Sequence, residues 1–377
     1  MNIAILGLGT IGSGVDELLK GNDDICVKRI LDIRAWQDNM TTDINDIIND
    51  ESIETVVETM GGVHPALDYA LKCINSGKNY VTANKLLVSK CAKELQSAAD
   101  KNGVALLFSA ACGGGIPFLY NLMKTKQTDS IVKLGGILNG TTNFILDKLF
   151  CESEDYEEAL REAQALGYAE RDPSSDVDGL DTMRKLMLSC AVAFGRMPLE
   201  NSIPCYGISK ITKTDVQYAK CKGGTIKLIA GAEISDGKLQ TYVIPKLFGA
   251  DSPEGSIRLN VNYAWYSGKR IGTFSFTGQG AGKFPTANNI IRDIYAIMMS
   301  EKRMLPEGFT EGSADNSAKK TYYIRVPENC AGRFEGIAHV TENADGFVLI
   351  ETNRITFKEL KLALNDTNDY FAMLLED

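Results

Sequence analysis

Short apolar runs recur along the first third of the chain, and helical patterns separate them. The runs are continuous rather than alternating, as in strands that are buried on both faces. They lie at residues 3–6, 25–33, 53–62, 79–85 and 103–111, and the third leads into a glycine turn. Intervening segments such as residues 65–76 and 89–102 repeat their apolar positions at helical spacing. Strands that alternate with helices predict an α/β fold, with a doubly wound parallel sheet over residues 1–133.

The pattern changes near the end of that region. Residues 133–146 predict a strand, a turn and a helix, and residues 155–166 and 180–195 predict two further helices. Residues 222–276 hold short alternating segments, which are typical of an antiparallel sheet. Together these elements predict an α+β domain over residues 134–285.

Three further segments complete the expected organisation. A helix near residues 286–304 returns to the first domain. Residues 305–320 are polar and rich in Gly, Ser and Glu, so we expect a linker there. Residues 321–377 predict a small C-terminal unit with roughly a strand, a helix, two strands and a helix.

Composition narrows the class of protein. The formal net charge is −9 and the pI is near 5.0, which argues against nucleic acid and an anionic membrane surface as partners. Residues 104–123 are uncharged, but three consecutive glycines and a proline exclude a membrane-spanning helix. Nine cysteines without a CxxC pair predict reduced thiols and a cytoplasmic location. With only two histidines, acid–base chemistry must use Lys, Asp, Glu or Tyr.

The sequence GLGTIG joins the first predicted strand to the first helix. Gly7 permits a tight turn, Gly9 lets backbone amides approach a pyrophosphate, and Gly12 lets the helix pack on the strand. This context predicts a Rossmann-type dinucleotide site. Asp32 ends the second strand and suits the ribose hydroxyls of NAD, whereas Arg34 suits the 2′-phosphate of NADP, so both cofactors stay open.

Residues 167–185 carry five carboxylates and end in Lys185. Such a density of acidic residues is typical of a solvated loop. A calcium loop is excluded because Lys185 occupies the twelfth position, where a bidentate Glu is needed. Asp181 and Lys185 are four residues apart on an apolar helix, so they share a face. The alternative is a weak surface ion pair. We interpret them as a proton-transfer pair near a nicotinamide, with Glu170 available for a substrate ammonium group. Lys85, just after a strand, is a second candidate.

Several stretches together resemble the homoserine dehydrogenase family. They occur in the family's order over roughly residues 1–300, and the NGTTN and GYAE-DP-D-G-D-K blocks are the most specific. The stretches are GLGTIGSGV (7–15), ETMGG (58–62), VTANKLLV (81–88), GGGIPF (113–118), GILNGTTNFIL (136–146), EALREAQALGYAERDPSSDVDGLDTMRKL (158–186) and GQGAGKFPTANNIIRD (278–293).

The resemblance implies reversible, NAD(P)-dependent oxidation of L-homoserine to L-aspartate 4-semialdehyde by a homodimer with a Rossmann domain and a substrate and dimerisation domain. It implies catalytic roles for Lys185, Asp181 and Lys85. The implied substrate-binding residues are Glu170, Asp181, Thr141, Tyr168 and Asp176. The implied cofactor-binding residues are Gly7, Gly9, Thr10, Ile11, Gly12, Asp32, Thr59, Lys85, Gly167 and Gly282. A sodium site would use the backbone carbonyls of Ser109, Cys112, Gly114 and Ile116.

Some positions depart from the family pattern. The family commonly has Glu where Ser109 stands, and Tyr206-Gly207 replaces a Glu-Gly pair. Residues 321–377 are similar to a regulatory ACT domain only in outline, so the prediction is a degenerate ACT-like unit without threonine inhibition. Two other functions stay open. One is another NAD(P)-dependent dehydrogenase acting on an aspartate-derived amino acid, and the other is a non-catalytic, cofactor-binding sensor.

Overall fold

The computed structural model describes residues 1–34, 36–344 and 346–376. The chain divides into two compact units. The first unit comprises residues Met1–Ile131, Met187–Met197 and Gly278–Glu311, and the second comprises Val132–Leu186, Pro198–Thr277 and Gly312–Asp377. Each unit is therefore assembled from three separate segments of the chain.

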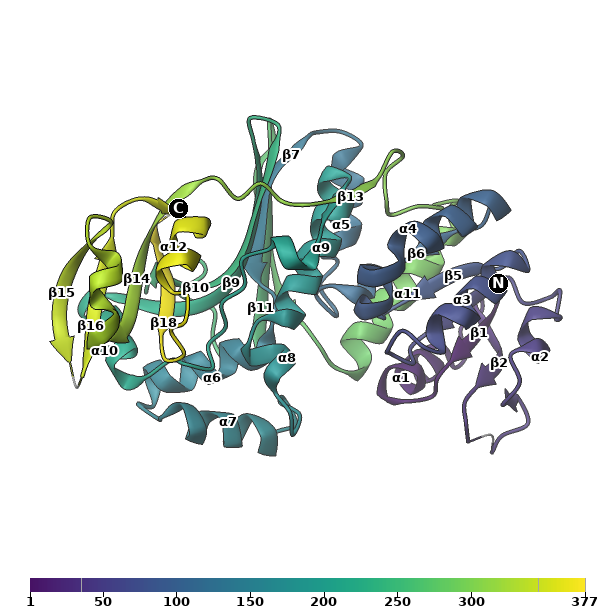
Figure 1. The fold of residues 1–377 in the computed structure, drawn as a ribbon. Helices are drawn as coiled ribbons and strands as arrows, with labels where there is room; N and C mark the ends of the chain where they lie inside the picture. The colour runs from purple at the N-terminus through teal and green to yellow at the C-terminus, as the bar shows by residue number, and fades with distance from the viewer. Residues whose placement is uncertain (35, 345, 377) are drawn as a thin grey trace. The chain divides into compact units, whose positions relative to one another are not determined.

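The first unit is built on a parallel sheet that, over the described residues, has six strands in the order β3-β2-β1-β4-β5-β6 (Figure 1). The strands are β1 (Asn2–Leu6), β2 (Cys26–Leu31), β3 (Met40–Thr41), β4 (Thr55–Glu58), β5 (Asn79–Thr82) and β6 (Leu106–Leu107). The strand order reverses between β1 and β4, which is where such sheets bind ligands at their carboxyl ends. The predicted doubly wound sheet is confirmed.

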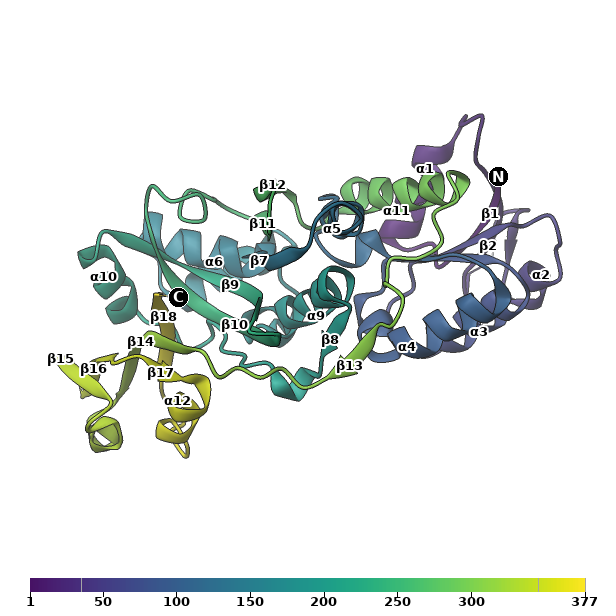
Figure 2. The ribbon, with the colours of Figure 1, turned by 90° about the horizontal axis from the view of Figure 1, so that it is seen from above.

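Helices cover both faces of this sheet. Figure 2 shows α1 and α11 on one face and α3 and α4 on the other. The helices are α1 (Thr10–Leu19), α2 (Asn45–Ile48), α3 (Ala66–Asn75), α4 (Lys85–Asn102), α5 (Phe118–Lys126) and α11 (Lys283–Met298), with a short 3-10 turn, η1 (Ser109–Ala111). A Cβ on Gly14 would lie 2.9 Å from the Lys283 carbonyl oxygen, so glycine lets α1 and α11 pack closely. Lys283 also pairs with Glu17 at 2.6 Å.

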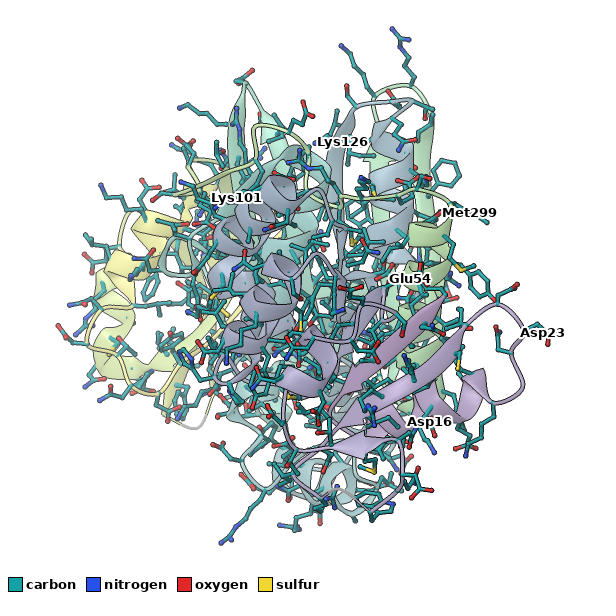
Figure 3. All side chains as sticks on the ribbon, turned by 90° about the vertical axis from the view of Figure 1, so that its right-hand side faces the viewer. Asp16, Asp23, Glu54, Lys101, Lys126 and Met299 are labelled. Carbon is teal, nitrogen blue, oxygen red and sulfur yellow. The ribbon has the colours of Figure 1, made fainter. Side chains whose placement is uncertain are left out.

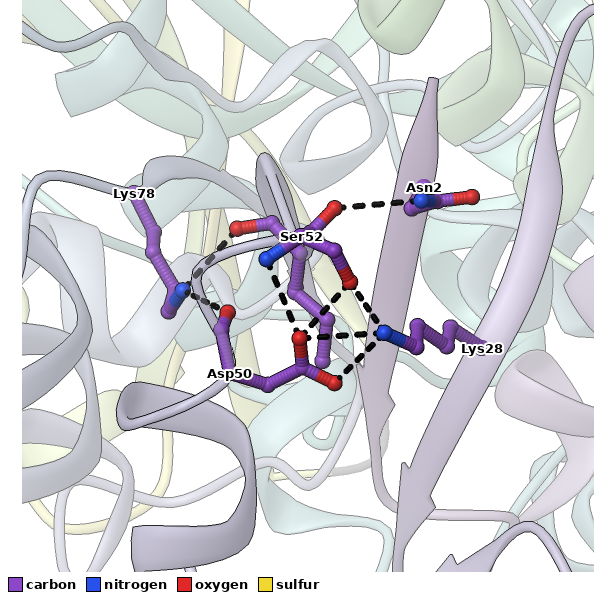
Figure 4. Close-up of polar contacts among 6 residues, drawn as sticks. Asn2, Lys28, Asp50, Ser52 and Lys78 are labelled. Carbon is purple, nitrogen blue, oxygen red and sulfur yellow. Dashed lines mark hydrogen bonds and ion pairs between the residues drawn. The ribbon is translucent and has the colours of Figure 1, made fainter.

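A polar cluster closes the amino ends of these strands (Figure 4). Lys28 on β2 pairs with Asp50 at 2.8 Å, and Ser52 Oγ donates to the same carboxylate at 2.6 Å. These donors hold the pKa of Asp50 well below its usual range. The buried Lys78 donates to the Asp50 carbonyl at 2.8 Å, and Asn2 Nδ2 donates to the Ser52 carbonyl at 3.2 Å. The cluster is satisfied by its own members, which is typical of a structural role.

The second unit is built on a larger mixed sheet of ten strands, counted over the residues that the structure describes. Nine of them follow the order β12-β11-β7-β9-β10-β18-β14-β16-β15, and β17 pairs with β14. They are β7 (Ile131–Ile137), β9 (Gly224–Ser235), β10 (Lys238–Gly249), β11 (Val261–Gly268), β12 (Gly272–Gln279), β14 (Lys319–Pro327), β15 (Ala338–Ala344), β16 (Phe347–Thr352), β17 (Ile355–Thr356) and β18 (Phe371–Glu376).

The remaining elements of the chain include five helices, three of which carry residues of the candidate site. They are α6 (Gly140–Cys151), α7 (Tyr156–Ala165), α8 (Ser174–Val177), α9 (Leu180–Phe194) and α10 (Lys213–Cys221). Five further elements are short. They are η2 (Glu200–Ser202), η3 (Glu328–Phe334) and α12 (Phe357–Ala363), and the strands β8 (Arg196–Pro198) and β13 (Thr310–Gly312), which pair with each other.

The C-terminal residues share a hydrophobic core with the rest of the second unit. Ile229 and Ile244, on β9 and β10, lie in one cluster with Ile324 on β14 and Phe357 on α12. Where a first helix was predicted in this segment, the structure has a short 3-10 helix, η3, over residues 328–334. The sequence reasoning missed the final strand, β18. The ACT-like character of the segment stays a prediction.

A buried ion pair reinforces this attachment. Both carboxylate oxygens of Asp215, on α10, accept from Arg325 Nε on β14 at 3.1 Å, and Tyr323 Oη donates to Asp215 at 2.8 Å. Burial raises the pKa of Asp215, although Arg325 and the capping contacts with Thr212 oppose that shift. The pair is therefore stabilised by several hydrogen bonds and not by charge alone.

Charges of both signs lie on the outside of the first unit. Asp23, Glu54 and Lys101 are all exposed (Figure 3). None of the helices in the described ranges combines the length and the apolarity that a membrane crossing requires.

Candidate active site

The glycine-rich turn follows β1 in the first unit, where the strand order reverses. Gly7 has φ +91°, a conformation that favours glycine. At Gly12 a Cβ would overlap the Gly7 carbonyl oxygen and would lie 2.8 Å from Thr59 Oγ1. At Gly9, by contrast, a Cβ would meet nothing within 4 Å. A side chain at Gly12 would therefore clash with the protein, whereas a side chain at Gly9 would enter open space.

The N-terminus of α1 begins directly after this turn. Its N-cap residue, Gly9, offers no side chain to satisfy the first amides of the helix, which belong to Thr10 and Ile11. Such a helix end attracts an anion through its N–H groups and its dipole. The open space at Gly9 and the uncapped helix therefore fit the pyrophosphate of NAD(P).

Asp32 follows β2 and is held next to the turn. Its Oδ2 accepts from the Leu8 amide at 2.8 Å, and its Oδ1 accepts from the Arg34 amide at 3.0 Å and from Arg34 Nε at 3.3 Å. Burial opposes ionisation, but these hydrogen bonds outweigh it and lower the pKa of Asp32. A carboxylate fixed beside the glycine turn fits the ribose of the cofactor. Arg34 is engaged with that carboxylate and stacks over Trp36 at 5.3 Å.

Beyond β4, Thr59 Oγ1 donates to the Gly7 carbonyl at 2.8 Å and ties the two central strands together. The sequence reasoning missed Glu58, which is fully buried and accepts from Thr82 Oγ1 at 2.6 Å and from the Met60 amide at 2.7 Å. Burial raises the pKa of Glu58, against these hydrogen bonds.

Glu58 also contacts the residues at and just after the end of the next strand, β5. Asn84 Nδ2 lies 3.5 Å from Glu58 Oε1, and Asn84 Oδ1 accepts from the Leu87 amide at 3.1 Å, so Asn84 caps α4. Lys85 is the first residue of that helix and is partly buried. An Asn directly before a helical pattern is an N-cap signal that identifies this contact from sequence.

The second unit holds the predicted acid–base pair. Lys185 Nζ lies 2.7 Å from Asp181 Oδ2 and donates to the Leu138 carbonyl at 2.6 Å. Both side chains are buried, although both are ionisable. The predicted i, i+4 pairing is therefore present, and its burial distinguishes it from a surface ion pair.

Asn139 connects this pair to a second carboxylate. Its Nδ2 donates to Asp176 Oδ1 at 2.7 Å and to Asp181 Oδ2 at 2.9 Å. Its Oδ1 accepts from the Thr142 amide at 2.8 Å, so Asn139 is also the N-cap of α6. The sequence reasoning gave a role to Thr141 in NGTT but missed Asn139. The same capping signal, a buried Asn between a strand and a helix, marks the residue.

Further predicted substrate residues surround the start of α6. Thr141 Oγ1 donates to the Tyr168 carbonyl at 2.6 Å, and the Tyr168 ring meets Phe144 edge to face at 5.2 Å. Gly167 has φ +76° just after α7, as expected for the residue that ends a helix. Glu170 is exposed three residues later. The structure thus places Thr141 against the segment that carries Glu170.

The predicted sodium ligands are backbone carbonyls, and two of them converge on one point. Asn289 Nδ2 occupies the point on which the carbonyls of Gly114 and Ile116 converge, at 2.8 and 3.2 Å. Ser109 contributes its amide and hydroxyl to the buried Asp293. Cys112 Sγ lies 3.6 Å from Ser189 Oγ. The contacts of Ser109 and Cys112 involve an amide and side chains and not their carbonyls, so the sodium site stays a prediction. Gly282, at φ +118°, is the N-cap residue of α11.

Comparisons with known proteins agree with both units. The family model for homoserine dehydrogenase matches residues 117–295, and the model for the homoserine dehydrogenase NAD-binding domain matches residues 7–109. Homoserine dehydrogenase of Bacillus subtilis is 36% identical over 315 residues, covering 79% of this chain and 73% of that protein. The Synechocystis homoserine dehydrogenase is 38% identical over 317 residues, with the same coverage.

Solved structures give the same result. The crystal structure of a homoserine dehydrogenase from Thiobacillus denitrificans has a TM-score of 0.88 at 28% identity, covering 100% of this chain and 98% of that chain. A homoserine dehydrogenase from S. aureus has a TM-score of 0.78 at 30% identity, covering 99% and 98%. Sequence motifs, site geometry and relatives coincide, and the chain belongs to the homoserine dehydrogenase family of NAD(P)-dependent oxidoreductases.

Proposed function

We propose that Lys185 is the general acid and base in the interconversion of L-homoserine and L-aspartate 4-semialdehyde. The observation that carries this proposal is the buried contact of Lys185 with Asp181 and with the Leu138 carbonyl. Bound NAD(P) supplies the hydride acceptor or donor. Lys185 takes the hydroxyl proton during oxidation and returns it to the carbonyl oxygen during reduction.

Asp181 orients the lysine through the 2.7 Å contact and contacts the substrate. Glu170 binds the substrate ammonium group, because an exposed carboxylate on the segment held by Thr141 is accessible to a small cation. Tyr168 and Asp176 complete the substrate-binding set. Lys85, at the start of α4, stabilises the reacting oxygen electrostatically.

The experiment is the appearance of reduced-nicotinamide absorbance when L-homoserine is added with NAD or with NADP. Activity with homoserine and none with aspartate-derived amino acids that lack the 4-hydroxyl group supports the proposal. Cofactor binding without turnover on any of these substrates would favour the sensor instead.

We propose NAD as the preferred cofactor, because Asp32 is held ionised where a 2′-phosphate would approach. Asp32→Ser is expected to change the ratio of kcat/KM for NADP to that for NAD by about tenfold to hundredfold in favour of NADP. Steady-state kinetics with both cofactors measure it. Asp23→Ser, which removes an exposed carboxylate from the same unit, should leave the ratio unchanged. An unchanged ratio in the Asp32 variant would contradict this preference.

A homodimer is the proposed assembly. β12 is an edge strand of the sheet in the second unit, and the apolar side chains of Phe274 and Ile271 near it are exposed. An apolar edge strand is suited to pairing with a second copy. Phe274→Lys is therefore expected to shift the mass measured by light scattering from two chains towards one. A monomeric wild-type protein would refute the proposal.

A further inference from the structure

The amide group of Asn139 has a fixed orientation. Its Oδ1 faces the Thr142 N–H, and its Nδ2 faces two carboxylates. Exchanging the two atoms would place an NH₂ group against an N–H donor and an oxygen against two acceptors, at the cost of all three hydrogen bonds. The residue is only 4% exposed, so water does not readily replace those contacts. The two N–H bonds of the amide are therefore committed to Asp176 and Asp181.

This arrangement couples Asn139 to the lysine. The oxygen that accepts from Asn139, Asp181 Oδ2, is the same atom that pairs with Lys185 Nζ. The residue before Asn139, Leu138, contributes the carbonyl that accepts from Lys185. Like charges repel, so Asp176 and Asp181 need a shared donor to stay close to one amide group. Without that donor, Asp181 keeps its ion pair with Lys185 but loses the hydrogen bond that fixes the position of Oδ2.

We propose that Asn139 is a positioning residue for the acid–base chemistry, and that it acts by holding Asp181 against Lys185 while it bridges Asp181 to Asp176. The proposal rests on the function proposed above for Lys185. Asn139 is not a catalytic residue in this scheme, because its contacts are with carboxylates and with the start of α6.

The capping role of Asn139 can be separated from this bridging role. Asn, Asp and Ser are about equally good N-cap residues, so Asn139→Asp and Asn139→Ser both keep the cap of α6. Neither variant has an NH₂ group that can reach two carboxylates. If Asn139 serves only the helix, Asn139→Ser, which keeps the cap and adds no charge, should behave like the wild type.

The test measures kcat and the pH dependence of kcat/KM for homoserine oxidation in these two variants. Both should lower kcat by about 10- to 100-fold, because Lys185 loses its fixed position. Asn139→Asp also adds a negative charge beside the lysine, which favours the protonated ammonium. Oxidation needs the neutral amine, so the rising limb of the profile should move to higher pH by about one unit.

Asn143 provides a matched control on the same helix. It is fully buried, its Nδ2 donates to the carbonyls of Leu259 at 2.8 Å and Val261 at 3.2 Å, and its Oδ1 accepts from Lys227 Nζ at 3.0 Å. Asn143→Ser therefore removes structural hydrogen bonds without touching either carboxylate. This variant should lower the midpoint of thermal unfolding and leave the pH limb in place.

Wild-type kcat and an unmoved limb in both Asn139 variants would overturn the inference. So would a limb that moves equally in Asn143→Ser, since that would indicate a general loss of packing. Lys185→Met separates this failure from that of the proposed function. If Lys185→Met is inactive while the Asn139 variants are normal, only the role of Asn139 is wrong. If Lys185→Met is active, the proposed function itself is wrong.

Discussion

Lys185→Met is expected to reduce kcat for homoserine oxidation by about a thousandfold, while binding of reduced cofactor stays near the wild-type level. Methionine has a similar length but cannot accept a proton, so the alkoxide that develops on the substrate has no base at this position. Cofactor binding should survive because the glycine turn and Asp32 belong to the first unit, whereas Lys185 belongs to the second.

Lys185→Arg distinguishes proton transfer from charge. Arginine keeps the positive charge beside Asp181, but it does not release its proton at any working pH. We therefore expect Lys185→Arg to be nearly as inactive as Lys185→Met. Recovery of more than about a tenth of wild-type kcat in the arginine variant would indicate that charge stabilisation, and not proton transfer, is the main role.

Arg184→Met is the matched control for both lysine variants. Arg184 is the neighbouring residue on α9, and it pairs with Glu200 at 3.7 Å. Its loss removes a cation from the same helix without altering Asp181 or Lys185, so kcat should stay within about twofold of wild type. Stopped-flow measurement of nicotinamide absorbance gives the rates, and fluorescence titration with NADH gives the affinities. Wild-type turnover in Lys185→Met would refute the assignment.

The second large effect is expected in the glycine turn, where two glycines should fail in different ways. Gly12→Ala places a methyl group on the Gly7 carbonyl, a backbone atom that cannot rotate away. The overlap should destabilise the protein by about 1–3 kcal/mol. It should also weaken cofactor binding by about tenfold to hundredfold, because binding must then restore the native turn.

Gly9→Ala should leave stability unchanged, since a Cβ there meets no atom within 4 Å and the backbone has an ordinary φ of −76°. It should still weaken cofactor binding, because the methyl group enters the space where we place the pyrophosphate. Thermal unfolding and NADH titration of both variants measure the two effects separately. Wild-type affinity in Gly9→Ala would show that the pyrophosphate lies elsewhere.

Sequence patterns over a few neighbouring residues predicted those parts of the site whose contacts are made between neighbouring residues. The turn between β1 and α1 follows from glycine spacing, and the contact between Asp181 and Lys185 follows from helical periodicity, so both could be identified from the sequence. The parallel sheet was predicted for the same reason, since continuous apolar runs between helices admit few other arrangements.

Contacts between distant segments were not predictable in this way. Asn139 lies 42 residues before Asp181, and Lys185 donates to the carbonyl of Leu138, which lies 47 residues before it. A carbonyl contact leaves no trace in residue identity, because every residue has a carbonyl. The position of β18 in the sheet also depends on pairing with strands that are distant in the sequence. A short apolar run does not by itself specify which strands it will pair with.

The position of β18 also affects how the protein is made. This strand joins β10 to β14, with Leu374 opposite Lys246. A ribosome adds about 5–20 residues per second, so β10 is complete many seconds before residues 371–376 exist. Until β18 is made, the edge of β10, and later that of β14, lacks this partner and can pair with other chains. A nascent chain that stalls before Phe371 is therefore a natural client for chaperones, although its nucleotide-binding unit is already complete.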